Sequence, residues 1–360
     1  MKGLLFFTIS LIFTISVYSQ APKFSNDFLN IGVGARGLAM GSAVSATSVD
    51  VTGAYWNPAE MALGNSNFQV AGQHAQWYSG IGNYDYVGFG KRLDSDKRSF
   101  GAVSLIRMGI DDIPNTLRLR GPDGSIDYSR ISSFSVADYA LLVSYGRRLG
   151  NVEKDSPFSI GANLKLIHRT FGSFAKSFGF GFDAGIAYEK SGWHLSMMAR
   201  DITTTFNAYK FSFSDEEKAT LQLTGNDIPK SSVEVNLPKL ILGIAYNIKL
   251  SNKIGLLPCV DIEFSGNGTS TQLLPASNLG IDPRIGFELD FKRKIFLRFG
   301  ANNFQSIPSL IDPNKKDFSV QPSGGLGLKL GRIGLDYALT NIASTGVGLY
   351  SHYISLNLDF

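Results

Sequence analysis

The sequence predicts an all-β protein: a transmembrane antiparallel β-barrel of about fourteen strands whose lumen holds an N-terminal plug or hatch. Three observations predict this fold. They are an export signal at the amino terminus, segments of alternating polarity that recur from residue 66 to the carboxyl end, and short connections that tend to alternate with longer ones. The predicted domains are a signal peptide over 1–19, a plug or hatch segment over 20–65 and the barrel over 66–360.

The amino terminus has the pattern of a secretory signal peptide. Lys2 precedes an apolar run from Leu4 to Ile15, and Val17 and Ser19 supply small residues near a cleavage position expected after Ser19. The run of about a dozen residues is short beside the roughly 20 that a membrane-spanning helix needs, so a retained anchor is the lesser alternative. No Cys directly follows the run, and no lipid attachment is expected.

The composition excludes several classes of protein. The chain is 44% hydrophobic and contains 39 Gly, yet beyond residue 19 no apolar stretch is long enough for a spanning helix. A formal net charge of +4 is too small for a nucleic-acid-binding protein, so no nucleic-acid partner is expected. The single Cys259 cannot form an internal disulfide. Export without a helical span indicates the outer membrane, with its lipid as the first partner.

Alternating or Gly- and aromatic-rich segments, separated by polar turn residues, each predict one barrel strand. In one of them, Phe287 and Leu289 alternate with Glu288 and Asp290, which places charge on one face and apolar groups on the other. The segments lie near 66–79, 83–92, 98–110, 133–149, 157–170, 177–190, 192–203, 237–250, 253–265, 283–292, 294–304, 318–331, 333–343 and 347–360.

The last seven residues carry the most regular pattern. Ile354, Leu356, Leu358 and Phe360 share one face of a strand, and polar residues occupy the other. The terminal Phe360 resembles the signal by which bacterial barrel-assembly machinery recognises its clients, so this machinery is an expected partner. Taken alone, the segment also fits a half-buried edge strand of a soluble sandwich.

The connections provide an independent test of the barrel. Barrels of this kind have short periplasmic turns and longer extracellular loops, so both barrel ends are expected on the periplasmic side. A soluble sandwich has no reason for this asymmetry. The short connections are 93–97, 150–156, 191, 251–252, 293 and 332. The others are 111–132, 171–176, 204–236, 266–282 and 305–317, with 80–82 and 344–346 as short exceptions.

The segment before the first strand is rich in Gly and Ala and ends in a turn that leads into a short helix. Small residues let one stretch of chain pack closely on another, so the segment is expected to fold into the lumen. Arg36 is expected to pair with a lumen carboxylate. The predicted plug residues are Gly34, Arg36, Gly37, Met40, Gly41, Trp56, Asn57 and Pro58.

Two motifs in this segment resemble the N-terminal signature of the PorV/PorQ family: Phe28-Leu-Asn-Ile-Gly-Val-Gly-Ala-Arg-Gly-Leu-Ala-Met-Gly41 and Tyr55-Trp-Asn-Pro-Ala59. The resemblance is strongest over 24–64 and extends as architecture over the whole chain. It implies an outer-membrane protein of Bacteroidota with a FadL-like, fourteen-stranded barrel and an N-terminal hatch. It also implies a role in type IX protein secretion, with a translocon component or exported cargo as partner.

No residue pattern predicts an enzyme, a cofactor or a metal site. Gly32-Val-Gly-Ala-Arg-Gly37 matches a dinucleotide-binding pattern, but no βαβ unit follows, so close packing is the better interpretation. The four histidines lack metal-ligand spacing. Inward charges are expected to form an ionic ladder between wall and plug, in preference to an acid–base pair. They are Asp261, Glu263, Glu288, Asp290, Lys249, Lys292, Arg298 and Lys329.

Two functions remain open. The first is a non-enzymatic subunit or adaptor of type IX secretion that binds its partner through outer loops, chiefly 204–236, 111–132 and 266–282. The second is a FadL-like transporter of long-chain fatty acids or other hydrophobic small molecules, which needs an apolar pocket under the loops and a kink or gap in the wall. The resemblance favours the first. The loop 204–236 fits either function through Phe206, Tyr209, Phe211 and Phe213.

Overall fold

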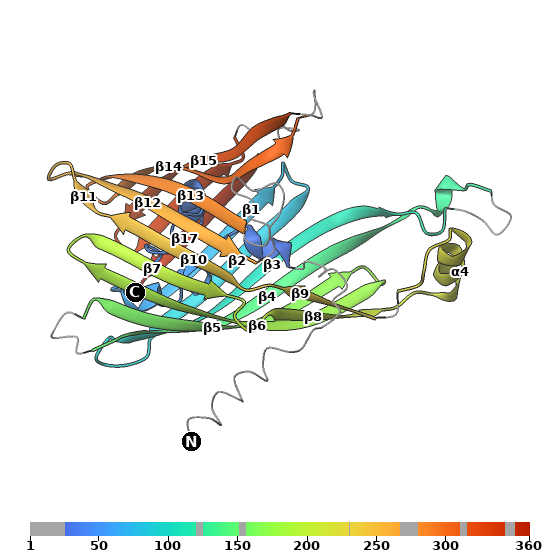
Figure 1. Cartoon of the computed structure of the whole chain (residues 1–360), viewed down its shortest axis with the longest axis horizontal. Helices are drawn as coiled ribbons and strands as arrows, with labels where there is room; N and C mark the ends of the chain where they lie inside the picture. The colour runs from blue at the N-terminus through green and yellow to red at the C-terminus, as the bar shows by residue number, and fades with distance from the viewer. Residues whose placement is uncertain are drawn as a thin grey trace, which may run out of the picture.

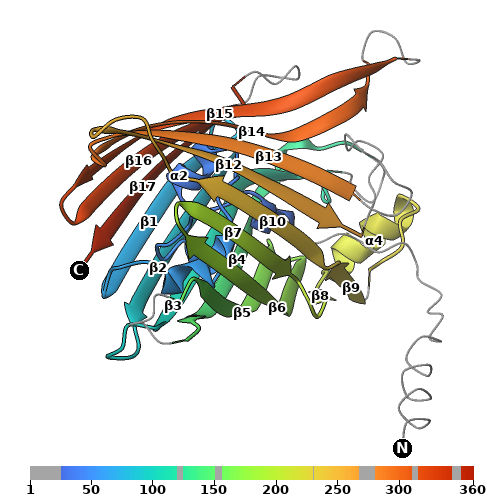
Figure 2. The same ribbon diagram turned by 60° about the vertical axis from the view of Figure 1, so that its left-hand side comes forward.

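The computed structural model describes residues 26–119, 125–150, 156–229, 231–266, 280–309, 315–342 and 350–360. The predicted signal peptide lies outside these residues. Long antiparallel strands form most of the molecule (Figure 1) and surround short helical turns from the first part of the chain (Figure 2). In the described ranges, no helix is long and apolar enough to cross a membrane.

The prediction of a fourteen-stranded antiparallel barrel is confirmed. Each wall strand overlaps one of the alternating segments, and β11 (Ile248–Lys249) continues β10 along β12. The wall strands are β1 (Phe68–Trp77), β2 (Gly82–Arg92), β3 (Ser99–Asn115), β4 (Ser132–Arg148), β5 (Phe158–Phe171), β6 (Ala175–Lys190), β7 (Trp193–Arg200), β10 (Lys239–Tyr246), β12 (Ile254–Ser265), β13 (Gly280–Phe291), β14 (Ile295–Pro308), β15 (Lys316–Leu330), β16 (Ile333–Thr340) and β17 (Ser351–Asp359).

The first and last strands close the barrel, because β1 pairs with β17 along its length. Phe360 extends this ladder: its carbonyl accepts from the amides of Asn67 and Phe68 at 3.0 and 3.1 Å. Closure leaves neither strand with an unpaired edge. Phe360 lies at the end of the barrel with the tight turns, called here the short-turn end; the opposite end is the long-loop end.

One predicted loop contains two strands and a helix. The sequence predicts 204–236 as an outer loop, but β8 (Thr205–Phe211) pairs with β6, and β9 (Ser231–Asn236) pairs with β8. The reason is that side chains of β8 alternate between buried and exposed, as a wall strand requires. These strands lengthen the wall at the long-loop end. The segment that connects them contains α4 (Asp215–Leu223), which projects from the barrel (Figure 1).

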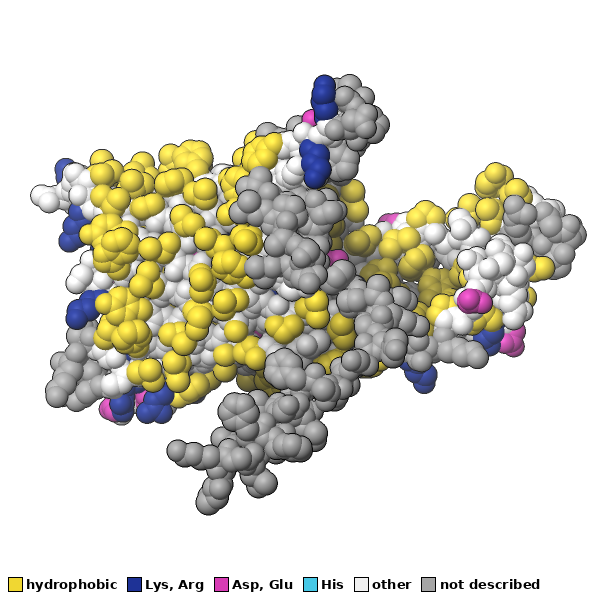
Figure 3. All heavy atoms as spheres, in the orientation of Figure 1, with side chains coloured by type: hydrophobic (Ala, Val, Ile, Leu, Met, Phe, Trp, Pro, Cys, Tyr) yellow, Lys and Arg dark blue, Asp and Glu magenta, His cyan; other side chains and the backbone are white. Residues whose placement is uncertain are grey.

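The wall has an apolar outer face and a polar inner face. On β17, Ile354 and Leu356 are exposed, whereas Ser355 between them is buried. Figure 3 shows apolar side chains spread over the outside of the barrel, with the visible charged side chains toward its ends. This distribution suits lipid around the wall and a polar interior.

Residues 26–64 form short helical turns: η1 (Asp27–Asn30), α2 (Ala35–Ala39), α3 (Gly53–Trp56) and η2 (Glu60–Ala62). Most of these residues are buried, and they supply much of the hydrophobic core. Strands from opposite sides of the ring hold them. The Gly34 amide donates to Gln73 of β1 at 2.6 Å, and the Ser45 amide donates to Asp261 of β12 at 2.9 Å. The N-terminal segment therefore lies against the inner face of the wall.

Candidate functional site

Two glycines of the N-terminal segment sit where a larger residue would collide. A Cβ on Gly37 would come within 3.0 Å of the Trp56 ring, whose indole N–H donates to the Val33 carbonyl at 2.8 Å. Gly41 has a φ of +60°, and its Cβ would meet the Ala301 backbone nitrogen at 2.5 Å. Gly37 leaves room for the Trp56 indole, and Gly41 lets the segment approach the backbone of the wall in a left-handed conformation that favours glycine.

The rest of the predicted plug motif also contacts the wall. Met40 is fully buried. The Asn57 side-chain amide donates to the Ile186 carbonyl of β6 at 3.2 Å. The Pro58 carbonyl packs so closely on β5 that a Cβ on Gly161 would come within 2.8 Å of it. The motif thus joins the segment to several wall strands.

Arg36 pairs with a lumen carboxylate, as the sequence predicts. Its Nε donates to Glu288 at 2.9 Å, and its Nη1 donates to the Thr47 carbonyl at 3.1 Å. Glu288 also accepts from Arg298 Nε at 2.6 Å, and Arg298 Nη1 donates to Asp336 at 2.6 Å. This four-residue ionic network links the segment to β13, β14 and β16.

The other residues of the predicted ionic ladder are scattered. Asp261 accepts from the Ser45 amide, and Glu263 pairs with Lys239 at 2.8 Å. Asp290 accepts from a turn amide near the short-turn end, where Lys249 and Lys292 are exposed. Lys329 pairs with Asp359 at 3.1 Å and is half exposed. The prediction that Asp290, Lys249, Lys292 and Lys329 belong to a ladder on the lumen wall is therefore wrong in position: they lie at the rim, near the ends of their strands.

An apolar cavity of about 600 Å³ lies at the long-loop end, between η1 and the ends of β3 to β6 and β8. Its size and its aromatic and aliphatic lining are those of a small-molecule site. The charged residues at its edge are Asp27, Asp138, Arg169 and Glu234. The apolar lining includes Phe28, Trp77, Ile110, Phe171, Tyr209 and Phe211.

Arg169 is held at the edge of this apolar cavity by several partners. It donates to both carboxylate oxygens of Asp138, at 2.8 and 3.0 Å, and to the Tyr209 hydroxyl at 2.7 Å. Its guanidinium also lies 5.1 Å from the centroid of the Phe171 ring. The bidentate pair and the ring fix its geometry.

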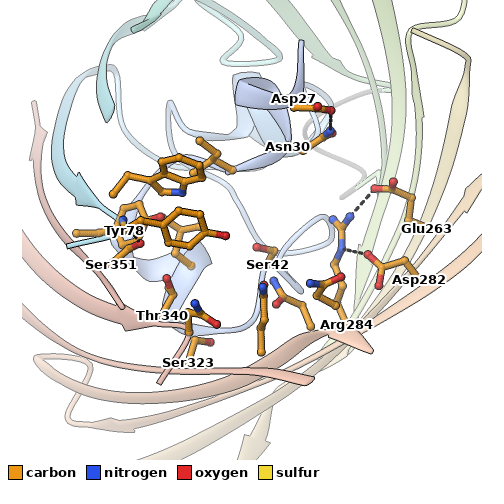
Figure 4. Close-up of a pocket in the computed structure, with 18 of the residues that line it drawn as sticks. Asp27, Asn30, Ser42, Tyr78, Glu263, Asp282, Arg284, Ser323, Thr340 and Ser351 are labelled. Carbon is orange, nitrogen blue, oxygen red and sulfur yellow. Dashed lines mark hydrogen bonds and ion pairs between the residues drawn. The ribbon is translucent and has the colours of Figure 1, made fainter. Parts of the chain in front are cut away.

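A second, polar cavity of about 390 Å³ adjoins the first (Figure 4). Asp27, Ile31 and Trp77 line both cavities. On one side, Arg284 reaches Asp282 at 3.5 Å and also bonds Glu263. Figure 4 shows hydroxyl-bearing side chains gathered around the rest of the space, among them Ser42, Tyr78, Thr340 and Ser351.

The four aromatic residues of the predicted partner loop do not share one face. Tyr209, Phe211 and Phe213 line the apolar cavity, and the Phe211 and Phe213 rings stack with centroids 6.3 Å apart. Phe206 faces outward beside the Phe180 ring. Three of the four therefore border a cavity that can hold a ligand.

The wall is interrupted between β7 and β8. β6 pairs with β8 as far as Phe180 and with β7 from Ala184 onward. Between these two stretches the ladder is irregular, although the Ile202 amide still donates to the Phe182 carbonyl at 2.9 Å. The neighbouring strand breaks at 237–238, between β9 and β10. Pro238 has no amide hydrogen to continue a ladder there. The result is a bulged kink in the wall.

A buried ion cluster closes the wall behind this kink. Lys165 lies 2.8 Å from Asp183 and also bonds Asp201. The Asp201 carboxylate accepts from the Thr205 hydroxyl at 2.5 Å, and its amide donates to Asp183 at 2.8 Å. The cavity beside the cluster measures about 20 Å³, which is room for roughly one water. The kink is therefore sealed in this structure.

Sequence reasoning missed Asp138, Lys165, Asp183 and Arg169. The available signal was alternation, which places Lys165 and Arg169 on one face of the segment 157–170. Their partners depend on the register between strands, which alternation alone does not determine. Within the described residues, no group of three or more His, Cys, Asp or Glu side chains is placed to hold a metal ion.

No family model and no curated protein match the chain. Solved structures do. One is the CymD monoaromatic hydrocarbon channel, with a TM-score of 0.56 and 11% identity over 92% of this chain and 98% of that one. Another is the Pseudomonas putida toluene transporter TodX, with a TM-score of 0.57 and 13% identity over 91% and 96% of the two chains. A Pseudomonas aeruginosa FadL homologue gives 0.55 and 12% over 94% and 100%.

The fold is that of the FadL-like outer-membrane barrels. At these identities the similarity establishes the architecture of the barrel and not its ligand. The resemblance to the PorV/PorQ family stays a prediction. This FadL-like barrel nevertheless has both features that a transporter needs: an apolar cavity at the long-loop end and a kink in the wall close to it.

Proposed function

We propose that this protein is an outer-membrane channel for hydrophobic small molecules, which bind first in the apolar cavity at the long-loop end. The cavity carries the proposal, because its aromatic lining is enclosed by strand ends and by η1. The similar structures support it, since two of them are a monoaromatic hydrocarbon channel and a toluene transporter. In this proposal the long-loop end faces the outside of the cell.

The N-terminal segment acts as the plug in this proposal. Because residues 26–64 bond to strands around the ring, a ligand has no straight path through the lumen while they stay in place. The kink at 201–204 provides a second way out, since β8 borders both the kink and the apolar cavity. Passage there requires the Lys165 cluster to open.

Filling the cavity tests the channel. Ala175 is buried on β6 and lines the cavity, so Ala175→Trp should occupy the ligand's space. Saturable uptake of a radiolabelled alkylbenzene by cells that express the variant should fall at least about tenfold. The matched control is Ala184→Trp, on the outward face of the same strand. Both variants should show the heat-modifiable migration of a folded barrel. Unchanged uptake in a folded Ala175→Trp barrel would exclude the cavity as the entry site.

A second candidate function is the secretion adaptor, favoured by the projecting arm formed by α4 and the extended β3–β4 and β8–β9 strands. Glu216 of α4 pairs with Arg130 at 2.5 Å and with Arg118 at 3.5 Å, which ties the two hairpins together. Tyr128 and Leu223 on this arm are 74% and 80% exposed. An exposed apolar arm suits a protein partner, here a type IX translocon component or exported cargo.

The α4 part of the arm can be removed without touching the cavity. Replacing 215–227 by a short Gly-Ser turn keeps β8, β9 and Phe213. Under the adaptor proposal this variant loses co-purification with its partner but keeps ligand binding. Equal recovery of partner proteins with and without α4 would count against an adaptor that binds its partner through this helix.

A further inference from the structure

The two cavities at the long-loop end form one composite site. Asp27, Ile31 and Trp77 line both, so a ligand that fills one touches the boundary of the other. One part is walled by aromatic rings, and the other by hydroxyl, amide and charged groups. A site divided in this way matches a molecule with an apolar chain and a polar head.

The charges around the composite site exclude one kind of head group. Five carboxylates and three basic side chains line it, which is a formal excess of negative charge. The acids are Asp27, Asp138, Glu234, Glu263 and Asp282, and the bases are Arg169, Lys239 and Arg284. A carboxylate ligand would add another negative charge to this set.

Each of the three bases already has an acidic partner. Arg169 donates to both oxygens of Asp138, which uses the fork that would otherwise grip a ligand carboxylate. Lys239 pairs with Glu263 at 2.8 Å, and Arg284 bonds both Glu263 and Asp282. An anionic head would have to displace one of these carboxylates, and the displaced acid would then lack its cation.

Uncharged hydrogen-bonding groups complete the polar cavity. Ser42, Asn302, Gln321, Thr340 and Ser351 line it. Hydroxyl and amide side chains both donate and accept, so together they match a neutral head such as an alcohol, an ester or an amide.

We infer that the ligand is an uncharged amphiphile, with its apolar chain in the aromatic cavity and its neutral head in the polar one. This inference rests on the proposed channel function and narrows its substrate class. It separates the protein from carriers of ionised long-chain acids.

Trp77 reports on both cavities, so brominated probes that quench its fluorescence test the inference. The full chain would be placed in lipid nanodiscs, with Trp193→Phe as background because Trp193 faces outward and is 47% exposed. Trp56 is 3% exposed and lines neither cavity, so its fluorescence forms a constant baseline. The probes are 11-bromoundecan-1-ol, 11-bromoundecanoate and (11-bromoundecyl)trimethylammonium, at about pH 8 so that the carboxylate is ionised. The alcohol should quench saturably, and the carboxylate should need at least about a tenfold higher concentration.

Removing two acids should reduce the difference in binding between the alcohol and the carboxylate probe. The variant Asp27→Asn with Glu234→Gln leaves Arg169 paired with Asp138, because Glu234 lies 3.9 Å from Arg169 and is the more distant acid. The carboxylate should then bind about tenfold better, the order of one screened charge nearby, while the alcohol changes little. Asp96→Asn with Asp215→Asn removes two exposed acids elsewhere and should change neither value.

The outcomes separate the two proposals. If the carboxylate binds the unmodified cavities as tightly as the alcohol, the charge argument is wrong and the channel stands. If the cationic probe binds more tightly than the alcohol, the inference of an uncharged head group is wrong. If no probe quenches Trp77 saturably, the cavity is not a ligand site and the channel proposal itself fails.

Discussion

Replacing Glu288 by Gln should loosen the N-terminal segment from the wall. The Glu288 carboxylate lies between two guanidinium groups, 2.9 Å from Arg36 Nε and 2.6 Å from Arg298 Nε. Gln keeps the shape but loses the charge, and its amide nitrogen is a donor that faces other donors. Arg298 retains Asp336 at 2.6 Å, whereas Arg36 retains the Thr47 carbonyl.

The expected cost follows from the exposure of the two cations. Removing one partner of a buried ion pair costs about 3–5 kcal/mol. The Arg298 side chain is 3% exposed but that of Arg36 is 23% exposed, so Arg36 regains some hydration. We therefore expect a loss of about 3 kcal/mol in the free energy of unfolding. Combining Glu288→Gln with Arg36→Met should show a coupling energy of about 1–3 kcal/mol, because the two residues share one contact.

Urea unfolding of the reconstituted barrel, followed by heat-modifiable migration and by Trp fluorescence, measures both quantities. Asp290→Asn is the matched control, since Asp290 lies on the same strand and accepts from a turn amide. It should cost under about 1 kcal/mol, the usual contribution of one hydrogen bond. Additive losses in the double variant would refute the conclusion that the Arg36–Glu288 ion pair holds the N-terminal segment to the wall. A loss for Glu288→Gln no greater than for Asp290→Asn would refute it as well.

Deleting Phe360 should reduce the amount of folded barrel in the membrane, because its backbone bonds Asn67 and Phe68 and its ring lies 5.8 Å from the Phe68 ring. Leu358→Lys should also reduce the amount of folded barrel. Its energetic cost should be smaller than the about 2–4 kcal/mol of a lipid-facing cation at the midplane, because residue 358 lies near the rim. Normal levels of both folded variants would argue against a terminal assembly signal. A Cys in place of Leu223 should label in intact cells and one in place of Asp96 should not, and the reverse pattern would invert the topology; the native Cys259 is buried and stays silent. Burial raises the pKa of the Glu60 carboxyl well above its usual range, so folding takes up a proton there. Stability from this group is therefore greatest below its unfolded pKa and falls, by up to about 1.4 kcal/mol per pH unit, as the pH rises toward the folded pKa. Glu60→Gln should flatten that slope in urea titrations at several pH values, and an unchanged slope would assign the proton to another group.

The strands could be predicted because a wall between lipid and a polar lumen imposes a period of two on every strand. Alternation in 177–190 and 347–360 reflects this directly, and β6 and β17 follow it. The strand β8 was missed because Thr205–Phe211 is short and adjoins the charged start of α4, so it reads as part of a polar loop. The polar residues around this segment hid its alternation of buried and exposed side chains.

The composite site could not be predicted, because its parts come from distant stretches of the chain. Asp27, Arg169 and Glu234 meet at one cavity only after η1, β5 and β9 are placed relative to one another. Alternation tells which residues face inward but not which of them are neighbours across strands. The sequence predicted that Arg36 pairs with a carboxylate in the lumen, but it could not tell that Glu288 is the partner, because several acids face inward.

The contacts of the N-terminal segment also determine when the chain can finish folding. The Ala35 amide bonds the Ser355 hydroxyl, 320 residues away, and the Gly41 amide bonds the Ser323 hydroxyl, 282 residues away. Contacts of such long range cost much loop-closure entropy and make folding slow. We therefore expect residues 26–64 to complete their packing only after the last strands have paired, which leaves Trp56 and Met61 without their native contacts until then. We also expect assembly to depend on a holding chaperone until β17 has paired, and a chain truncated before β17 to aggregate instead of forming a smaller barrel.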